Sequence, residues 1–183
     1  PRSGMHVDIS INNTLAIHNT KLLAQYAKLD ERVKQLAKCV KHWALHRNLS
    51  DAHNGTLSSY GWSVLVIFHL IKEGVIANLQ SGEDRTIADI EGKEYDITIN
   101  DISKSDSASK ASLAELLYSF FKNYATFDWT NEIVSIRSGK SLTRDEKGWM
   151  NEEPSALDVI NSQKEKPPRM GEHHLSIEDP FDL

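Results

Sequence analysis

The chain of 183 residues contains one cysteine, Cys39, which excludes a disulfide framework and a zinc site built from several thiolates. It contains no run of 18 apolar residues, because Ser63 and His69 interrupt the longest apolar stretch, so we expect no membrane-spanning helix. Glycine-rich phosphate loops, dinucleotide-binding glycine motifs and nucleophile-elbow motifs are also absent from the sequence. This composition favours an intracellular, cytoplasmic protein with no membrane partner.

Basic residues are concentrated at the start of the chain. Residues 1–50 carry 8 Lys or Arg against 3 Asp or Glu, whereas the remaining residues carry 13 against 23. A polyanionic partner would therefore prefer the first part of the chain. The net charge of −5 argues against a surface that coats nucleic acid broadly, although it is compatible with a local anion-binding pocket.

Apolar spacing predicts the main elements. Residues 5–11 alternate between apolar and polar side chains, which predicts a strand with Asp8 facing away from the core. Helices are predicted from near Asn19, after Asp30, from the Thr56–Ser59 hydroxyls to Ile71, and from Ser112. A short strand is expected over residues 132–137 and a short helix around residues 157–160. Residues 74–111 are polar and acidic with weak strand signals, so we expect a mobile, locally irregular surface connection there.

Several side chains could carry chemistry, but each also has an ordinary structural interpretation. Asp8 could hold a divalent metal, although spacing alone favours a solvated carboxylate on a strand. The hydroxyls that open the helix near Ser59 could bind phosphate or simply cap the helix. Tyr60 could stack on a base or fill the core, and an isolated helical lysine such as Lys41 is more often solvated.

Seven segments in a fixed order nevertheless point to one family. The chain resembles the non-canonical poly(A) polymerases and terminal uridylyltransferases of the DNA polymerase β-like nucleotidyltransferase superfamily. The segments are VDISINN, LAIHNTKLL, VKHWA, GTLSSYGW, LLYSFFKNYATFDW, EKGW and IEDPF. Each segment is weak alone, and their common order with compatible spacing makes the resemblance specific.

The resemblance implies an α+β fold in two parts. Residues 1–12 would be the end of the catalytic palm, with the last strand of the palm sheet. Residues 13–183 would form a mainly helical nucleotide-recognition domain, in which about residues 112–183 are the poly(A) polymerase-associated segment. The resemblance further implies a monomer that binds UTP (or ATP) and an RNA 3′ end.

The resemblance implies a role for each position of this chain that matches a family motif. Asp8 resembles the third metal-binding carboxylate, which would act with Mg²⁺ (or Mn²⁺). The other matching positions are nucleotide-binding in the family: Asn13 near the base and ribose, Asn19 and Thr20 near the ribose and triphosphate, Lys41 and Ser59 on the triphosphate, Tyr60 stacked on the base, and Asp179 near the base edge.

Two departures from the family pattern affect the expected activity. Leu45 stands where uridylyltransferases often carry a second lysine, so triphosphate binding should be weaker. The family's Gly-Ser turn and paired aspartates would lie upstream of residue 1, so the chain alone should be inactive. The motifs favour uridylyl transfer from UTP; the alternatives are a poly(A) polymerase that uses ATP and a catalytically dead RNA-binding scaffold.

Overall fold

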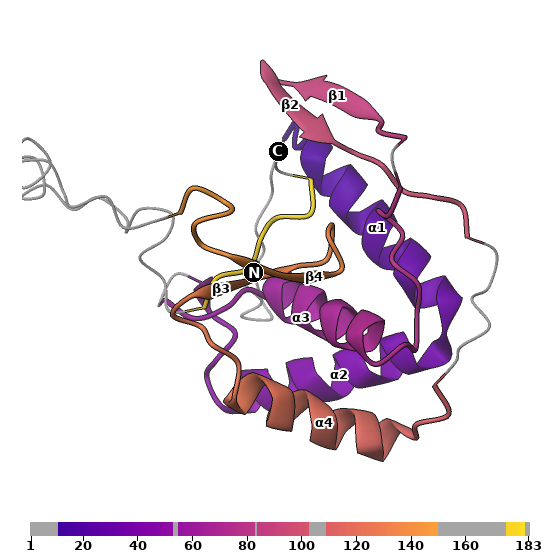
Figure 1. Cartoon of the computed structure of the whole chain (residues 1–183), viewed down its shortest axis with the longest axis vertical. Helices are drawn as coiled ribbons and strands as arrows, with labels where there is room; N and C mark the ends of the chain where they lie inside the picture. The colour runs from indigo at the N-terminus through magenta and orange to yellow at the C-terminus, as the bar shows by residue number, and fades with distance from the viewer. Residues whose placement is uncertain (1–10, 53–54, 83, 103–108, 150–174, 182–183) are drawn as a thin grey trace, which may run out of the picture.

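The computed structural model describes residues 11–52, 55–82, 84–102, 109–149 and 175–181. These residues form four helices and two small antiparallel sheets (Figure 1), which confirms the α+β class and its mainly helical content. The helices are α1 (Thr14–Leu29), α2 (Glu31–His46), α3 (Ser59–Lys72) and α4 (Leu113–Ala125). Strand β1 (Ile87–Ile90) pairs with β2 (Lys93–Asp96), and β3 (Glu132–Ser135) pairs with β4 (Lys140–Thr143). The predicted strand at 5–11 with Asp8, and the predicted helix around 157–160, lie outside the described residues.

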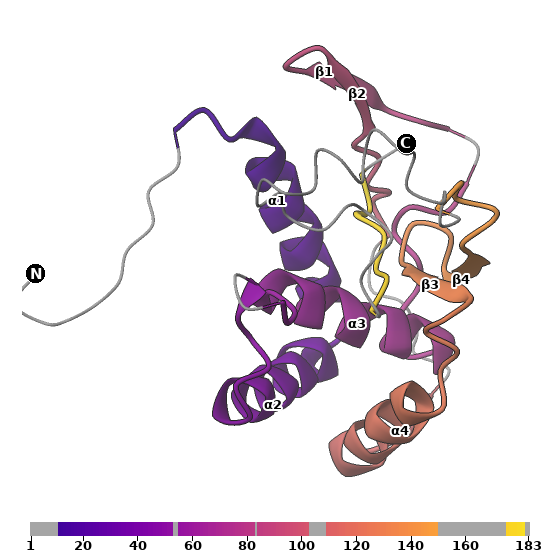
Figure 2. The same cartoon turned by 90° about the vertical axis from the view of Figure 1, so that its left-hand side faces the viewer.

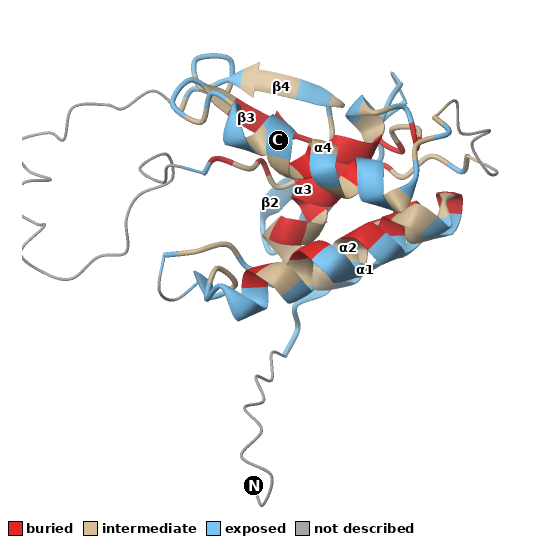
Figure 3. Cartoon of the chain, turned by 90° about the horizontal axis from the view of Figure 1, so that it is seen from below, coloured by how far each residue is buried: buried red, intermediate tan, exposed pale blue. Residues whose placement is uncertain are grey.

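Helix α3 lies at the centre of the fold because it is apolar on all sides. Residues 64–70 are all buried, including His69, whose ring nitrogen Nε2 lies 3.1 Å from the Leu116 carbonyl of α4. Helices α2 and α4 and strand β3 all contact α3. Figure 3 shows the buried residues following α3, while α2 and α4 turn exposed strips outwards. No helix within the described ranges is long and apolar enough to cross a bilayer.

Helix α1 begins earlier than the sequence predicted. Its N-cap is Asn13, whose side-chain Oδ1 accepts a hydrogen bond from the Ala16 amide at 3.1 Å, so the helix starts at Thr14 and not near Asn19. The preceding residue, Asn12, turns the chain with a φ of 60°. An asparagine cap satisfies an amide that the first turn of a helix leaves unpaired, and this local bond fixes the start.

The other predicted helix starts are confirmed. Asp30 caps α2 and Ser58 caps α3, each through a hydrogen bond accepted from a backbone amide of the first turn. Ser112 and Glu115 form a reciprocal capping box at the start of α4. The predicted apolar stripe of α2 is buried at Val33, Leu36, Val40 and Ala44.

The prediction that residues 74–111 form an irregular surface connection is wrong for much of that segment. It contains the β1–β2 hairpin, and Val75, Ile76, Leu79 and Gln80 are buried against the core. The polar composition was misleading because Gln80, Asp96 and Thr98 are buried with hydrogen-bond partners: Gln80 with the distant Pro180 O, and Asp96 with Thr98 and Arg85.

Residues 175–181 add an edge to β3. The predicted strand over 132–137 is confirmed as β3, although it ends at Ser135, and β4 was not predicted. Val134 forms a parallel bridge with Ile177, with Val134 N–H to Ser176 O at 3.0 Å and Glu178 N–H to Val134 O at 2.9 Å. In Figures 1 and 2 this segment, drawn in yellow, runs from β3 towards the β1–β2 hairpin.

Candidate functional site

A pocket of about 510 Å³ lies between the start of α3 and the segment 175–181. We call it the Tyr60 pocket. Its walls come from the loop before α3, from the first two turns of α3 and from the end of the described chain. The lining residues are Ala52, Gly55, Thr56, Leu57, Ser58, Tyr60, Gly61, Val64, Leu175, Ile177, Glu178 and Asp179.

Three of the predicted site residues meet beside this pocket. The Tyr60 hydroxyl donates a hydrogen bond to Oδ1 of Asn19 at 3.2 Å, which ties α3 to α1. Burial, and then the negative charge of Asp179, raise the pKa of the Tyr60 phenol above its ordinary value. Tyr60 therefore stays protonated at neutral pH, and its ring is fixed with a carboxylate nearby. An aromatic ring and a carboxylate in one pocket suit a planar ligand that has a hydrogen-bond donor on its edge.

A second pocket of about 600 Å³, the Ser59 pocket, adjoins the first and shares Ala52 and Ser58 with it. It is lined by Leu45, Asn48, Ser50, Asp51, Ala52, Ser58 and Ser59. Because Ser59 is the first residue of α3, the free amides and positive end of the helix dipole lie beside this pocket, where an anion is favoured.

The structure separates the roles of the three hydroxyls that precede or open α3. Ser58 is the cap, since its Oγ accepts from the Gly61 amide at 3.1 Å. Thr56 closes the preceding loop, because its Oγ1 accepts from Asp51 N–H at 2.7 Å and donates to Asp51 O at 2.8 Å. Ser59 lines the Ser59 pocket with its Oγ 3.4 Å from Ser50 Oγ. Ser59 is therefore the hydroxyl that remains for a ligand.

Of the remaining predicted site residues, those that the structure describes line neither of these pockets. Asn13 uses its side chain as the α1 cap, and the Thr20 hydroxyl donates to the Ala16 carbonyl of its own helix at 2.8 Å. Lys41 is partly buried on α2 and lines neither the Tyr60 pocket nor the Ser59 pocket. Asp8 lies outside the described residues.

Two buried polar residues that sequence reasoning missed hold the segment carrying Asp179, one through its side chain and one through its backbone. The side-chain amide of Gln80 donates to Pro180 O at 2.9 Å, and the backbone N–H of Asp96 donates to Phe181 O at 3.0 Å. Both side chains are buried, with 1% of Gln80 and none of Asp96 exposed. Their partners are backbone atoms at the other end of the chain, so no local pattern marks them.

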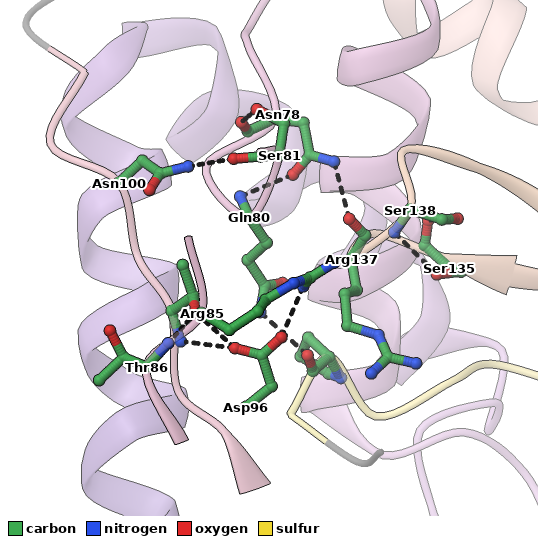
Figure 4. A network of polar contacts seen from close by, with 12 residues as sticks. Asn78, Gln80, Ser81, Arg85, Thr86, Asp96, Asn100, Ser135, Arg137 and Ser138 are labelled. Atoms are coloured by element: carbon green, nitrogen blue, oxygen red, sulfur yellow. Dashed lines mark hydrogen bonds and ion pairs between the residues drawn. The ribbon is translucent and has the colours of Figure 1, made fainter. Parts of the chain in front are cut away.

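The side chain of Asn78 extends this hydrogen-bond network to α1 and to the end of β3 (Figure 4). Asn78 Oδ1 accepts from the backbone N–H of Gln80 at 2.9 Å. The same oxygen accepts from the Tyr26 hydroxyl of α1 at 3.3 Å. Its Nδ2 donates to Arg137 O, just after β3, at 3.0 Å. Helix α1, the 78–80 loop and β3 are thereby joined behind the segment that ends in Asp179 and Pro180.

Asp96 is the anchor of the β1–β2 hairpin in this network. Arg85 Nη1 lies 2.5 Å from Asp96 Oδ2, while Thr98 donates its amide and its hydroxyl to Oδ1. Burial alone would raise the pKa of the Asp96 carboxyl, but these hydrogen bonds and the Arg85 charge outweigh it and hold the pKa below 3.8. The hairpin side of the network therefore carries a stable negative charge.

No group of three or more His, Cys, Asp or Glu able to hold a metal ion occurs among the described residues. The carboxylate for which the resemblance implies a metal, Asp8, is not one of them. The described geometry is thus that of a pocket for a planar ring beside a pocket for an anion.

Comparison with known proteins finds similarity to terminal uridylyltransferases and poly(A) RNA polymerases. Residues 112–183 match the family described as Cid1 family poly A polymerase. The chain is 37% identical to the terminal uridylyltransferase cid1 of Schizosaccharomyces pombe over 185 aligned positions, which covers 96% of this chain and 43% of that protein. It is 34% identical to the mouse poly(A) RNA polymerase GLD2, covering 81% of this chain and 32% of GLD2.

Solved structures agree with this result. A cytoplasmic RNA terminal U-transferase superposes with a TM-score of 0.74 at 35% identity, over 96% of this chain and 51% of that one. Cid1 in complex with the UTP analogue UMPNPP gives a TM-score of 0.73 at 35% identity, over 93% of this chain and 51% of that one. The chain thus spans less than half the length of these curated relatives and about half of these solved chains. Over the part that it spans, the chain is similar to non-canonical poly(A) and uridylyl polymerases, and its residues 112–183 match the family model.

Proposed function

We propose that this chain forms the nucleotide-recognition part of an RNA 3′-terminal nucleotidyltransferase that adds uridylate from UTP. The observation that carries the proposal is the meeting of Tyr60 and Asp179 at one pocket, with Asn19 of α1 hydrogen-bonded to the Tyr60 hydroxyl, from three segments far apart in the sequence. The similarity to Cid1, whose structure was solved with a UTP analogue, supports UTP as the nucleotide.

In this proposal the Tyr60 pocket receives the base. The Tyr60 ring stacks on it, and its hydroxyl bond to Asn19 keeps the ring in one orientation. The Asp179 carboxylate accepts a hydrogen bond from the ring N–H of uracil, because an ionised carboxylate can only accept. The corresponding ring nitrogen of adenine is itself an acceptor, so the same carboxylate disfavours that edge.

The Ser59 pocket receives the triphosphate. Ser59 and the amides at the start of α3 bind its oxygens, and Lys41 adds a positive charge from the neighbouring helix. We further propose that Asn13 and Thr20, near the start of α1, border the ribose side of the nucleotide. Burying the base and holding the phosphates places the α-phosphate for attack by an RNA 3′-hydroxyl, with pyrophosphate as the leaving group.

We propose residues 1–12 as the end of a catalytic palm and residues 13–183 as the mainly helical domain. Asp8 would be one ligand of Mg²⁺ or Mn²⁺, which when bound makes the RNA hydroxyl a better nucleophile and neutralises phosphate charge. We expect a monomeric cytoplasmic enzyme.

A second candidate, a poly(A) polymerase that uses ATP, is favoured by the 34% identity to GLD2. Parallel assays of the intact protein on a short RNA with each ribonucleotide separate the two. We expect UTP to be used with the highest kcat/KM, and Asp8→Ala to abolish addition. The control is Asp101→Asn, at an exposed position away from both pockets, which should leave addition unchanged. Preference for ATP would replace the first candidate by the second, and full activity of Asp8→Ala would refute the catalytic assignment.

A further inference from the structure

A buried carboxylate lies directly beside Asp179 in the chain. The Glu178 side chain has no exposed surface, and its Oε1 lies 2.5 Å from Arg137 Nη2 and 2.8 Å from Lys147 Nζ. The two cations are themselves largely enclosed, at 17% and 13% exposure. We call these three residues the Glu178 cluster.

The Glu178 cluster joins three separate segments. Arg137 follows β3, Lys147 lies in the turn after β4, within the EKGW motif, and Glu178 belongs to IEDPF. Three charges taken from water together are a weak source of stability, because desolvation offsets much of their attraction. Removing one partner is costly, however, since it leaves an uncompensated charge behind. Such clusters therefore specify one arrangement more strongly than they stabilise it.

The arrangement that this cluster specifies is the register of residues 176–181 on β3. Val134 N–H donates to Ser176 O, and Glu178 N–H donates to Val134 O. A slip of two residues that placed Ser176 at the position of Glu178 could restore this pattern, whereas the opposite slip would place Pro180 there, which has no N–H to donate. Neither Ser176 nor Pro180 supplies a carboxylate at that position. Only the Glu178 register lets Arg137 and Lys147 keep a carboxylate partner.

Register decides where Asp179 points. Successive residues of an extended segment face opposite sides, so Glu178 directed into the cluster leaves Asp179 on the pocket side. Asp179 lines the Tyr60 pocket and raises the pKa of Tyr60 by its charge, which places the carboxylate near the ring. Glu178 also contributes to the pocket wall, but with no exposed side-chain surface it offers no carboxylate to a ligand.

We propose that Arg137, Glu178 and Lys147 are positioning residues that fix the register of residues 176–181 and thereby aim Asp179 at the edge of the base. This inference rests on the proposed function, since it takes Asp179 to read the nucleotide. It gives the EKGW motif a role, because Lys147 supplies one of the two cations.

The test uses the intact protein with Glu178→Gln, which keeps the shape of the side chain and removes its charge. We expect the ratio of kcat/KM for UTP to that for ATP to fall by roughly tenfold, about the size of a charge-assisted hydrogen bond, through a higher KM for UTP. Lys147→Met should show the same effect in weaker form, because Arg137 still pairs with Glu178, and Lys147→Arg should restore the ratio. The matched controls are Glu94→Gln and Lys140→Met, at exposed positions on β2 and β4, which should leave the ratio unchanged.

A double-variant cycle separates positioning from general stability. If Glu178 acts through Asp179, Glu178→Gln should have little further effect on the UTP to ATP ratio when Asp179→Asn is already present. Equal loss of kcat/KM for UTP and ATP, or an unchanged ratio with only a lower melting temperature, would overturn the proposal.

Amide hydrogen exchange supplies a readout that does not depend on activity. Glu178→Gln should speed exchange at the Glu178 and Asp96 amides, which bond Val134 O and Phe181 O, while α2 amides stay protected. Absence of any nucleotide addition by the wild-type protein would refute the proposed function alone. Unchanged exchange in Glu178→Gln would refute the positioning role alone.

Discussion

The Tyr60 hydroxyl and the Asn19 amide oxygen, 41 positions apart in the sequence, lie 3.2 Å from each other and form a hydrogen bond. The bond ties the ring that lines the Tyr60 pocket to helix α1. A ring held by its hydroxyl loses less freedom when a ligand stacks on it, so part of the ordering cost of binding is met before the ligand arrives.

Replacing Tyr60 should separate stacking from orientation. We expect Tyr60→Ala to weaken UTP binding by about 1–3 kcal/mol, the usual contribution of an aromatic ring stacked on a base. Tyr60→Phe keeps the ring and loses the bond to Asn19, so it should cost about 1 kcal/mol. The measurement is a titration of the intact protein with a non-hydrolysable UTP analogue. Tyr118→Ala, at a 69% exposed position on α4, is the control. Equal binding by Tyr60→Ala and wild type would show that Tyr60 is not the stacking ring.

Introducing a lysine at residue 45 should strengthen triphosphate binding. Leu45 is 63% exposed and lines the Ser59 pocket, so a longer, charged side chain can be placed there without disturbing the core. We expect Leu45→Lys to lower the KM for UTP, by an amount equivalent to about 1 kcal/mol of binding free energy. Added salt should reduce this gain, because it screens the new charge. Leu45→Gln, which is polar but uncharged, should leave the KM near the wild-type value. A KM that does not respond to Leu45→Lys would place the triphosphate elsewhere.

The Asp96 carboxylate should make the fold sensitive to acid. Its pKa in the folded protein lies below its ordinary value of 3.8, so the ionised form stabilises the fold above that pH. This contribution is lost as the pH falls below 3.8 and through the folded-state pKa. Asp96→Asn should therefore be less stable than wild type near about pH 6, and the difference should shrink towards about pH 3. Thermal melts across this range test it, with the exposed Asp84→Asn as control. A pH-independent difference would mean that the loss comes from packing and not from the charge.

Removing the capping box of α4 should destabilise the fold without touching either pocket. The Ser112 hydroxyl accepts from the Glu115 amide at 3.3 Å, and the Glu115 carboxylate accepts from the Ser112 amide at 2.8 Å. We expect Ser112→Ala to lower the free energy of unfolding by about 1 kcal/mol, measured by urea denaturation. Thr130→Ala, on an exposed turn, should change it by less than about 0.5 kcal/mol. Wild-type stability of Ser112→Ala would show that the box contributes little here.

Features that depend on neighbouring residues were predictable from the sequence. The apolar stripe of α2 and the caps Asp30, Ser58 and Ser112 each follow from side chains within one or two helical turns. The start of α1 was placed too late because the apolar pattern becomes clear only near Leu22, whereas the cap at Asn13 determines the start.

Features that depend on distant partners were not predictable. The segment containing Gln80 and Asp96 was expected to be an irregular surface connection because it is polar, but polar residues can be buried when partners satisfy them. The Gln80 side chain finds its partner at Pro180 O, and the Asp96 backbone N–H finds its partner at Phe181 O, both at the far end of the chain. At the candidate site, Tyr60 and Asp179 were ordinary residues by local reasoning, and only the order of the motifs suggested a role. Their nucleotide contacts stay predictions.

The hydrogen bond from Gln80 to Pro180 closes a loop of 100 residues. Closing so long a loop is entropically unfavourable, so contacts of this kind form slowly and late compared with the pairing of adjacent helices. During synthesis on the ribosome, α1, α2 and α3 can pack long before residues 175–181 emerge. The Tyr60 pocket then lacks the wall that carries Asp179 and is completed only after nearly all of this chain has been made.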